Sequence, residues 1–186
     1  MIVEEHWNLH KKMAEFCHDP LLMLGNQECV LKSNIFTAKQ AFAELGIKEY
    51  TTLDPDGGDV SLDLNDDLGE LSGKYGTVFN LGTLEHIWDI HTAYCNALRA
   101  VSLNGTFVNV APIQGWENHG IHVTGGLSII AMMQLNGFEV IASFVYRNTR
   151  GVQLWSAAKK QEHIENLKDF CKPQQQYVNG KKEAVA

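Results

Sequence analysis

Short apolar runs alternate along this chain with longer segments whose apolar residues recur at helical spacing. The apolar runs are rich in Leu, Val, Ile and Phe and end at Gly, Pro or Asp, which is typical of buried strands. Several periodic segments end at a glycine, which is typical of helices. The predicted strands cover residues 20–25, 49–54, 59–65, 77–82, 105–112, 138–147 and 151–160. The predicted helices cover residues 34–46, part of 66–76, 88–102, 124–137 and 161–171.

This order of elements predicts an α/β fold with a doubly wound, mostly parallel seven-stranded sheet. Strands that alternate with helices pair in parallel, and the helices then cover both faces of the sheet. The last two strands are separated only by the turn NTRG at 148–151, so the final strand should run antiparallel. We expect an N-terminal helical lid or arm over residues 1–19, the main domain over 20–172 and a flexible tail over 173–186.

The composition fits one compact domain and disfavours several classes of function. The chain has 186 residues, of which 45% are hydrophobic and 20% are charged. Its net charge of −7 disfavours nucleic-acid binding, because the phosphate backbone attracts Lys and Arg. No apolar run approaches the roughly 20 residues that a membrane span needs, and the N-terminus lacks an apolar signal core. We therefore expect a cytoplasmic protein. The four cysteines form no CxxC pair, which disfavours a disulfide scaffold and a structural zinc site.

The ligand site of a doubly wound sheet lies at the carboxyl ends of its strands. The first strand ends in LGNQE (24–28), where Gly25 would let a ligand approach the backbone and Asn26 could bind its polar groups. Neither GxGxxG nor GxxxxGK[ST] is present, which disfavours an NAD-dependent dehydrogenase and a kinase.

The next two strand ends carry acidic residues, each of which has two interpretations. Asp54 could accept hydrogen bonds from a ribose diol, or it could be a solvated carboxylate in an Asp-Pro turn. Asp63 could recognise an adenine edge, or it could cap a helix as we expect of Asn65 and Asp66.

Two polar stretches follow the remaining parallel strands. Asn80, Gly82, Glu85 and His86 follow the fourth strand directly. The stretch APIQGWENHGIH (111–122) follows the fifth strand, and its glycines, Trp and two histidines predict a loop over a pocket.

Together these motifs resemble those of class I S-adenosylmethionine-dependent methyltransferases, and most closely a poorly characterised branch of methyltransferase-like proteins. The resemblance extends over residues 20–158, and GTLEHIWD (82–89) is its most specific part. The motifs are LGNQ at 24–27, DLN at 63–65, GTLEH at 82–86 and NHG at 118–120.

The resemblance implies a Rossmann-like methyltransferase fold that binds S-adenosylmethionine across the ends of the first four strands. Asp54 would hold the ribose hydroxyls, Asp63 and Leu64 would flank the adenine, and Gly25 would pass under the methionine portion. This cofactor has no phosphate, so a glycine-rich phosphate loop is not required. The implied cofactor-binding residues are Gly25, Asn26, Asp54, Asp63, Leu64, Asn80 and Gly82.

Methyl transfer to a hydroxyl or amine needs a base, and histidine titrates near neutral pH. We expect His119 to be this base and His86 to be the second candidate, although a histidine at the position of His86 often supports the architecture of the site. Trp116, Glu85 and His122 are the candidate substrate-binding residues, and we expect no metal. The expected partner is a small-molecule or sugar-like acceptor, and a second subunit of a homodimer could close the pocket.

Two other functions remain open. The first loop has Gly25 alone where typical family members carry several glycines, and Asn80 replaces a frequent Asp. Both departures fit a catalytically inactive binding protein on a methyltransferase fold. A metal-dependent hydrolase would instead use a motif-free cluster, Glu85, His86, Asp89, His91, His119 and His122.

Overall fold

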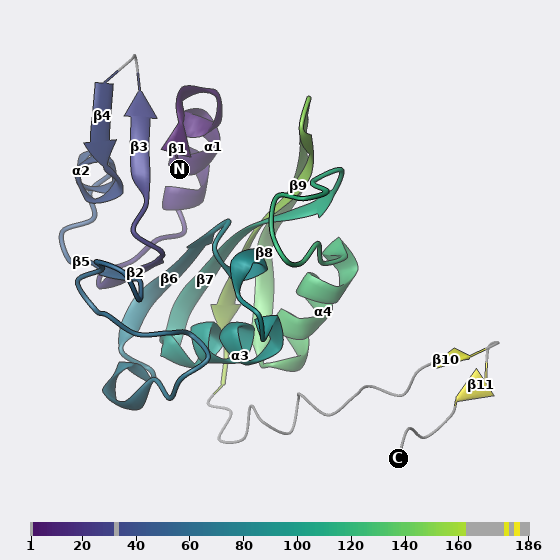
Figure 1. The fold of residues 1–186 in the computed structure, drawn as a ribbon. Coiled ribbons are helices and arrows are strands. Elements are labelled where there is room, and N and C mark those ends of the chain that lie inside the picture. The colour runs from purple at the N-terminus through teal and green to yellow at the C-terminus, as the bar shows by residue number, and fades with distance from the viewer. Residues whose placement is uncertain (1, 32–33, 163–176, 179–180, 183–186) are drawn as a thin grey trace.

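A six-stranded sheet forms the centre of the computed structural model, which describes residues 2–31, 34–162, 177–178 and 181–182 (Figure 1). Its strand order is β5-β2-β6-β7-β9-β8. The first four of these strands are parallel to one another, whereas β9 runs antiparallel to both of its neighbours. The strands are β2 (Leu21–Leu24), β5 (Tyr50–Leu53), β6 (Tyr75–Leu81), β7 (Val101–Gln114), β8 (Phe138–Asn148) and β9 (Gly151–Lys160).

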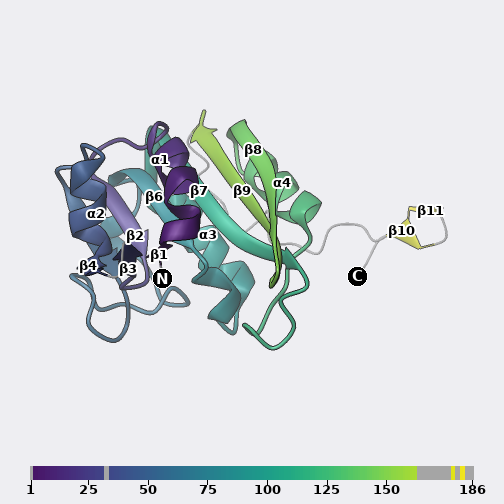
Figure 2. The ribbon, with the colours of Figure 1, turned by 90° about the horizontal axis from the view of Figure 1, so that it is seen from above.

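Helices cover both faces of this sheet because successive residues of each strand point to opposite sides (Figure 2). On β2, Leu22 and Leu24 enter one core, whereas Leu21 and Met23 enter the other. α3 and α4 pack on the first core, and α1 and α2 pack on the second. The helices are α1 (Glu4–Ala14), α2 (Ala38–Glu44), α3 (Ile90–Ala100) and α4 (Gly126–Leu135), with short 3-10 helices η1 (Gly69–Leu71) and η2 (Leu84–His86).

A small second sheet brings the N-terminus to the end of β2. The hairpin of β3 (Glu28–Leu31) and β4 (Asn34–Thr37) is inserted between β2 and α2, and β1 (Ile2–Val3) pairs in parallel with β3. The hydroxyl of Tyr146 on the edge strand β8 donates a hydrogen bond to Glu5, which links α1 to that edge of the main sheet.

The predicted fold class is confirmed, but the main sheet has six strands where the sequence predicted seven. Residues 59–65 form only an isolated bridge, between Val60 and Leu53. The Asp59 carboxylate accepts the backbone N–H of Thr52, and the Asp63 carboxylate accepts the backbone N–H of Asn65. On either side of the bridge, side chains therefore accept backbone N–H groups that a neighbouring strand would otherwise bind.

The predicted helix over 34–46 begins later than expected. Thr37 and Gln40 form a capping box, which fixes the start of α2 at Ala38 and leaves residues 34–37 free to pair with β3. The predicted helix within 66–76 is the single turn η1, and the predictions over 88–102 and 124–137 correspond to α3 and α4.

The predicted helix over 161–171 lies almost entirely outside the described residues. Most of the predicted tail lies outside them as well, and its described part is the short antiparallel pair of β10 (Tyr177–Val178) and β11 (Lys181–Lys182). Among the described residues, no helix is both long and apolar enough to cross a membrane.

The turn after β6 is held by a buried amide. The side-chain oxygen of Asn80 accepts the backbone N–H groups of Thr83 and Leu84, at 3.1 and 3.2 Å. Its side-chain nitrogen donates to the side-chain oxygen of Asn109 on β7, at 2.8 Å. This residue therefore sets the position of η2 relative to the sheet.

Replacing Asn80 tests this role. Asn80→Ala leaves two turn N–H groups without their acceptor, so we expect the free energy of unfolding to fall by about 1–3 kcal/mol. Asn80→Asp keeps the acceptor oxygen, and rotation of the Asn109 amide can turn its unpaired nitrogen toward the second oxygen. This variant should therefore lose less, which urea denaturation of the two variants would measure. Equal losses would show that the turn does not depend on the acceptor oxygen.

His10 on α1 makes the stability depend on pH. Its ring is buried against Phe79 and Trp155, both ring nitrogens lack a partner among the described residues, and burial lowers its pKa from 6.5 to about 3. Between these values the unfolded chain binds a proton that the folded chain does not, so this contribution to stability is complete above pH 6.5 and is lost toward pH 3.

We expect His10→Phe to flatten the pH dependence of unfolding in that window, measured by urea denaturation at several pH values. His91→Gln, at an exposed position of α3, is the control and should keep the dependence of the parent protein. Parallel pH profiles for His10→Phe and the parent protein would contradict the assignment.

Candidate functional site

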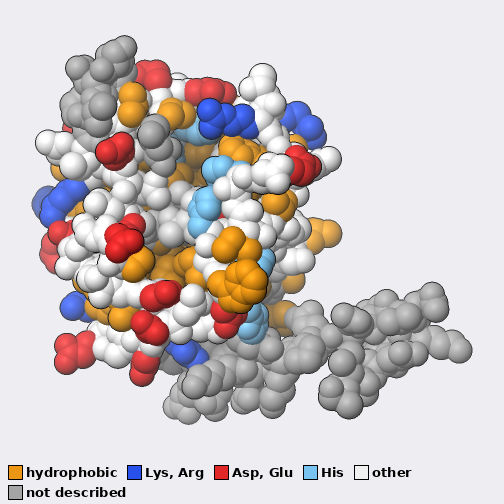
Figure 3. Space-filling model, in the orientation of Figure 1, with side chains coloured by type: hydrophobic (Ala, Val, Ile, Leu, Met, Phe, Trp, Pro, Cys, Tyr) orange, Lys and Arg blue, Asp and Glu red, His pale blue; other side chains and the backbone are white. Residues whose placement is uncertain are grey.

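Two adjoining cavities open at the carboxyl ends of the parallel strands. The larger has a volume of about 620 Å³ and the smaller about 400 Å³. Both are lined by Gly25, Asp54, Thr83 and His86, which therefore mark their junction. In Figure 3, histidine side chains lie along one side of a hollow on this face of the molecule.

The junction lies between β2 and β6, where the order of strands in the sheet reverses. The hydroxyl of Thr83 donates to the carbonyl oxygen of Leu24 at 2.7 Å and accepts from the Gln27 side chain at 3.2 Å. Gly25 is buried beside it with a φ of +83°, and a Cβ at this position would lie 2.7 Å from the Thr83 Oγ1. Only glycine fits here without displacing the threonine.

The carboxylate of Asp54 is held in one orientation at this junction. Its two oxygens accept the backbone N–H groups of Asn26 and Asp56, each at 2.9 Å. The Asn26 side chain donates to the carbonyl oxygen of Gly57, which fixes the first loop against the second. Each carboxylate oxygen keeps a further lone pair, so Asp54 can accept hydrogen bonds from a ligand.

The smaller cavity combines apolar walls with a polar rim. Asp63 and Asn65 contribute its polar groups, and the Asp63 carboxylate accepts both the backbone and side-chain N–H groups of Asn65, at 2.8 and 3.0 Å. Such a cavity suits a flat ring with polar edges. The apolar lining residues are Leu53, Pro55, Leu62, Leu64, Ile87, Trp88 and Ile121.

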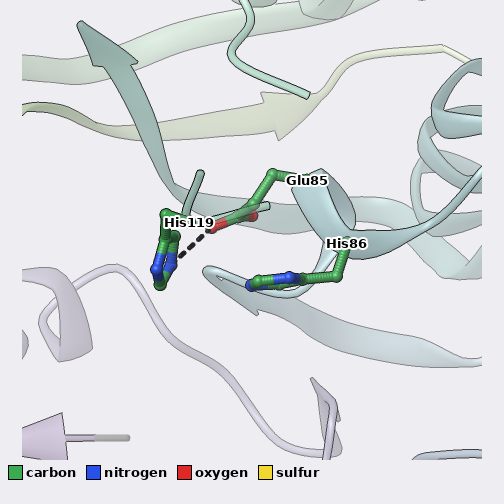
Figure 4. Close-up of side chains that lie close together, drawn as sticks. All are labelled: Glu85, His86 and His119. Atoms are coloured by element: carbon green, nitrogen blue, oxygen red, sulfur yellow. Dashed lines mark ion pairs between the residues drawn. The ribbon is translucent and has the colours of Figure 1, made fainter. Parts of the chain in front are cut away.

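Three side chains converge in the larger cavity (Figure 4). Glu85 and His86 come from η2, and His119 comes from the loop after β7. The Nε2 atom of His119 lies 3.9 Å from the Oε1 atom of Glu85, and one ligating atom from each of the three residues lies within 4.8 Å of the others. Gly82 makes room for the Glu85 side chain, because it has a φ of +68° and a Cβ there would lie 3.1 Å from Glu85 Oε1.

The environment of this cluster shifts the pKa values of two of its members. The Glu85 side chain is only 4% exposed, and burial raises its pKa from 4.5 to about 7. Burial lowers the pKa of His86, and the neighbouring His119 lowers it further. A shift of this kind is frequent at functional sites.

The loop after β7 is attached to η2 by its backbone. The carbonyl oxygen of Glu85 accepts the N–H groups of Ile121 and His122, at 2.9 and 3.0 Å. Gly120 permits this contact, because a Cβ there would lie 2.9 Å from the same oxygen. The ring of Trp116 packs edge-on against His119, with centroids 4.9 Å apart. These contacts place the backbone of His119 beside η2, whereas its ring is partly exposed.

Most of the residues proposed from the sequence lie together. Two do not line either cavity: the side chain of Asn80 is bonded beneath η2, and His122 Nε2 lies 3.0 Å from the carbonyl oxygen of Trp88. The larger cavity is lined by Gly25, Asn26, Asp54, Gly82, Glu85, His86, Trp116 and His119, and the smaller cavity by Asp63 and Leu64.

The cluster proposed for a hydrolase is only partly assembled. Glu85, His86 and His119 meet as described, whereas Asp89 caps α3 by accepting the N–H of Thr92 and His91 is exposed on that helix.

Sequence reasoning missed the contribution of the C-terminal hairpin. Arg150, in the turn between β8 and β9, and Gln153, on β9, line the larger cavity. Because β9 runs antiparallel, it begins at the same edge of the sheet where β7 ends. The predicted antiparallel strand was the signal that could have placed both residues at the site.

Comparison with solved structures gives several matches of the same kind. The 1,6-didemethyltoxoflavin-N1-methyltransferase of Burkholderia thailandensis, solved with S-adenosylhomocysteine, matches with a TM-score of 0.62 at 12% identity, over 86% of this chain and 80% of that one. The N-methyltransferase NodS of Bradyrhizobium japonicum, also with S-adenosylhomocysteine, has a TM-score of 0.62 at 12% identity, over 85% and 87%.

A third match is the magnesium protoporphyrin IX methyltransferase of Synechocystis, solved with S-adenosylmethionine. Its TM-score is 0.58 at 11% identity, over 85% of this chain and 79% of that one. No protein-family model matches the sequence, and no curated protein matches it either. The likeness in structure, with its mostly parallel sheet and antiparallel β9, shows that the chain has the Rossmann-like fold of the class I S-adenosylmethionine-dependent methyltransferases.

Proposed function

We propose that this protein transfers a methyl group from S-adenosylmethionine to a small-molecule or sugar-like acceptor. The observation that carries the proposal is the oriented carboxylate of Asp54 at the junction of two cavities, beside the buried Gly25. Methyltransferases of the same fold are solved with this cofactor or with its demethylated product.

The described residues fit the cofactor part by part. The adenine would occupy the smaller cavity between Leu64 and the rim formed by Asp63, and Asp54 would accept the ribose hydroxyls. The methionine portion would cross Gly25 and Gly82 into the larger cavity, where S-adenosylmethionine supplies an electrophilic methyl group. One glycine in the first loop is enough for this path. Gly25 is the position where the loop passes against Thr83, and a side chain there would collide with the threonine hydroxyl.

The larger cavity would hold the acceptor. Trp116 and Trp155 give it apolar walls, and Arg150 and Gln153 offer hydrogen-bond donors at its edge. Alignment of the reacting atoms can supply several kcal/mol of the barrier, about 7–11 kcal/mol in the best cases. We assign His119 as the group that accepts the proton of the acceptor, with His86 as the second candidate, because both line this cavity.

The position of the N-terminal segment supports the proposal that it acts as a lid. Val3 and His6 line the larger cavity, and the ring of His6 packs edge-on against those of Tyr146 and Trp155, with centroids 5.1 and 5.9 Å apart. Displacement of α1 would open the acceptor side without disturbing the junction at Asp54.

A catalytically inactive binding protein is the second candidate. The observation that favours it is the hairpin of β3 and β4, which follows the short first loop directly and replaces the usual passage from strand to helix. Cofactor binding separates the two candidates.

S-adenosylhomocysteine should bind the purified protein with micromolar affinity in isothermal titration calorimetry. A hundredfold excess over the Kd should raise the Tm by about 5–10 °C. Asp54→Ala should weaken binding by about 10–100-fold, because it removes a charged acceptor for the ribose hydroxyls. Asp56→Ala is the matched control, since this exposed carboxylate in the same loop lines neither cavity.

Absence of heat and of a thermal shift at millimolar ligand would overturn the proposed function in favour of the binding protein. Equal weakening by Asp54→Ala and Asp56→Ala would instead place the ribose elsewhere.

A further inference from the structure

A carboxylate and two imidazoles meet in the larger cavity. Glu85, His86 and His119 belong to two separate segments, and one ligating atom from each lies within 4.8 Å of the others. The Oε2 atom of Glu85 is buried and has no hydrogen-bond partner among the described residues. Buried polar atoms in folded proteins nearly always have one, so this oxygen requires a partner.

We propose that Glu85, His86 and His119 bind a divalent transition-metal ion in the larger cavity, with Zn²⁺ as the best match. The site does not require bound S-adenosylmethionine, because its three ligands are side chains of the protein and none of them lies in the first two loops. It differs from the cluster considered for a hydrolase, since Asp89 and His122 are engaged elsewhere.

The distances allow such a site with small movements. Zinc binds imidazole nitrogen and carboxylate oxygen at about 2.0–2.2 Å, so two ligands in a tetrahedral site lie about 3.4 Å apart. The separation of 3.9 Å between His119 Nε2 and Glu85 Oε1 is close to this value. His86 and His119 are exposed and can rotate inward, whereas Glu85 is buried and fixed, so the carboxylate provides the rigid ligand.

The kind of ligand decides the kind of metal. Imidazole suits zinc and other transition metals, whereas Mg²⁺ and Ca²⁺ prefer sites made of oxygen atoms. Three protein ligands leave at least one coordination position for a small molecule, as in catalytic zinc sites. All three ligands line the larger cavity, so that open position faces the space assigned to the acceptor.

The ion also gives the two histidines a role in methyl transfer, a consequence that rests on the proposed function. An acceptor oxygen bound at the open position would lose its proton to solvent more readily, because the charge of the ion lowers the pKa of a coordinated hydroxyl. His119 would then hold the ion instead of accepting the proton. The site predicts an acceptor that offers an oxygen atom to the metal.

The test is a titration of the chelator-treated full-length protein with Zn²⁺ in the presence of a competing chromophoric chelator and without S-adenosylmethionine. We expect one tight site per chain and no comparable site for Mg²⁺. Glu85→Gln and His119→Ala should each weaken Zn²⁺ binding by at least about 100-fold, since even partners that only support a ligand contribute about 10–100-fold. His91→Ala, which replaces an exposed histidine of α3, should leave the affinity unchanged.

Substitution with Co²⁺ gives a second measurement. The parent protein should develop visible absorption bands of a low-coordinate cobalt site, and His86→Gln and His119→Ala should each abolish them while the far-ultraviolet circular dichroism stays unchanged. Retention of these bands, or of tight Zn²⁺ binding by Glu85→Gln, would overturn the proposal, as would the absence of tight Zn²⁺ binding to the parent protein.

Asp54→Ala separates this inference from the proposed function. It should keep Zn²⁺ binding while losing affinity for S-adenosylhomocysteine. Zinc binding without any S-adenosylhomocysteine binding would leave the metal site standing and remove the methyltransferase, and the opposite result would remove the metal site alone.

Discussion

The Thr83 hydroxyl donates to the carbonyl oxygen of Leu24, and this hydrogen bond joins the ends of the two strands between which the sheet reverses its order. The rest of the site depends on it, because the same turn carries Glu85 and His86 into the larger cavity. Asn80 supports the turn from below by accepting the N–H groups of Thr83 and Leu84. This hydrogen bond also requires a glycine after β2, because a larger residue at position 25 would displace Thr83.

The sequence predicted this arrangement where local chemistry decides the structure, and failed where tertiary contacts do. The alternation of strands and helices was enough for the fold class, and most of the polar residues predicted after the strands line the two cavities. Asn80 lines neither cavity, because its side chain accepts the backbone N–H groups of its own turn, a contact that composition cannot reveal. Residues 59–65 alternate as a strand should, yet side chains rather than strand pairing satisfy the neighbouring backbone.

The cluster of Glu85, His86 and His119 could not be recognised from spacing. The loop after β7 reaches η2 only because Gly120 lies against the carbonyl oxygen of Glu85 and two of its N–H groups bond that oxygen. A metal-binding pattern within one helix, such as HExxH, is set by helical geometry and can be seen in a sequence. Here the third ligand is placed by backbone contacts between segments, so its pairing with Glu85 appears only in the folded chain.

The buried carboxylate of Glu85 also helps to distinguish a ligand-binding cavity from that of an inactive scaffold. A buried carboxyl oxygen without a hydrogen-bond partner lowers the free energy of unfolding by about 1–3 kcal/mol. A protein that binds no ligand in this cavity would gain nothing from such a group. An apolar side chain of the same size would pack in this wall without that penalty, as the neighbouring Leu84 does. The first loop, with its single glycine, is the part of the chain that departs from the motif of typical methyltransferases. Glu85 belongs to a different segment, η2, and lies beside His86 and His119. The polar cluster is therefore an argument for a ligand in that cavity that is separate from the argument for the cofactor.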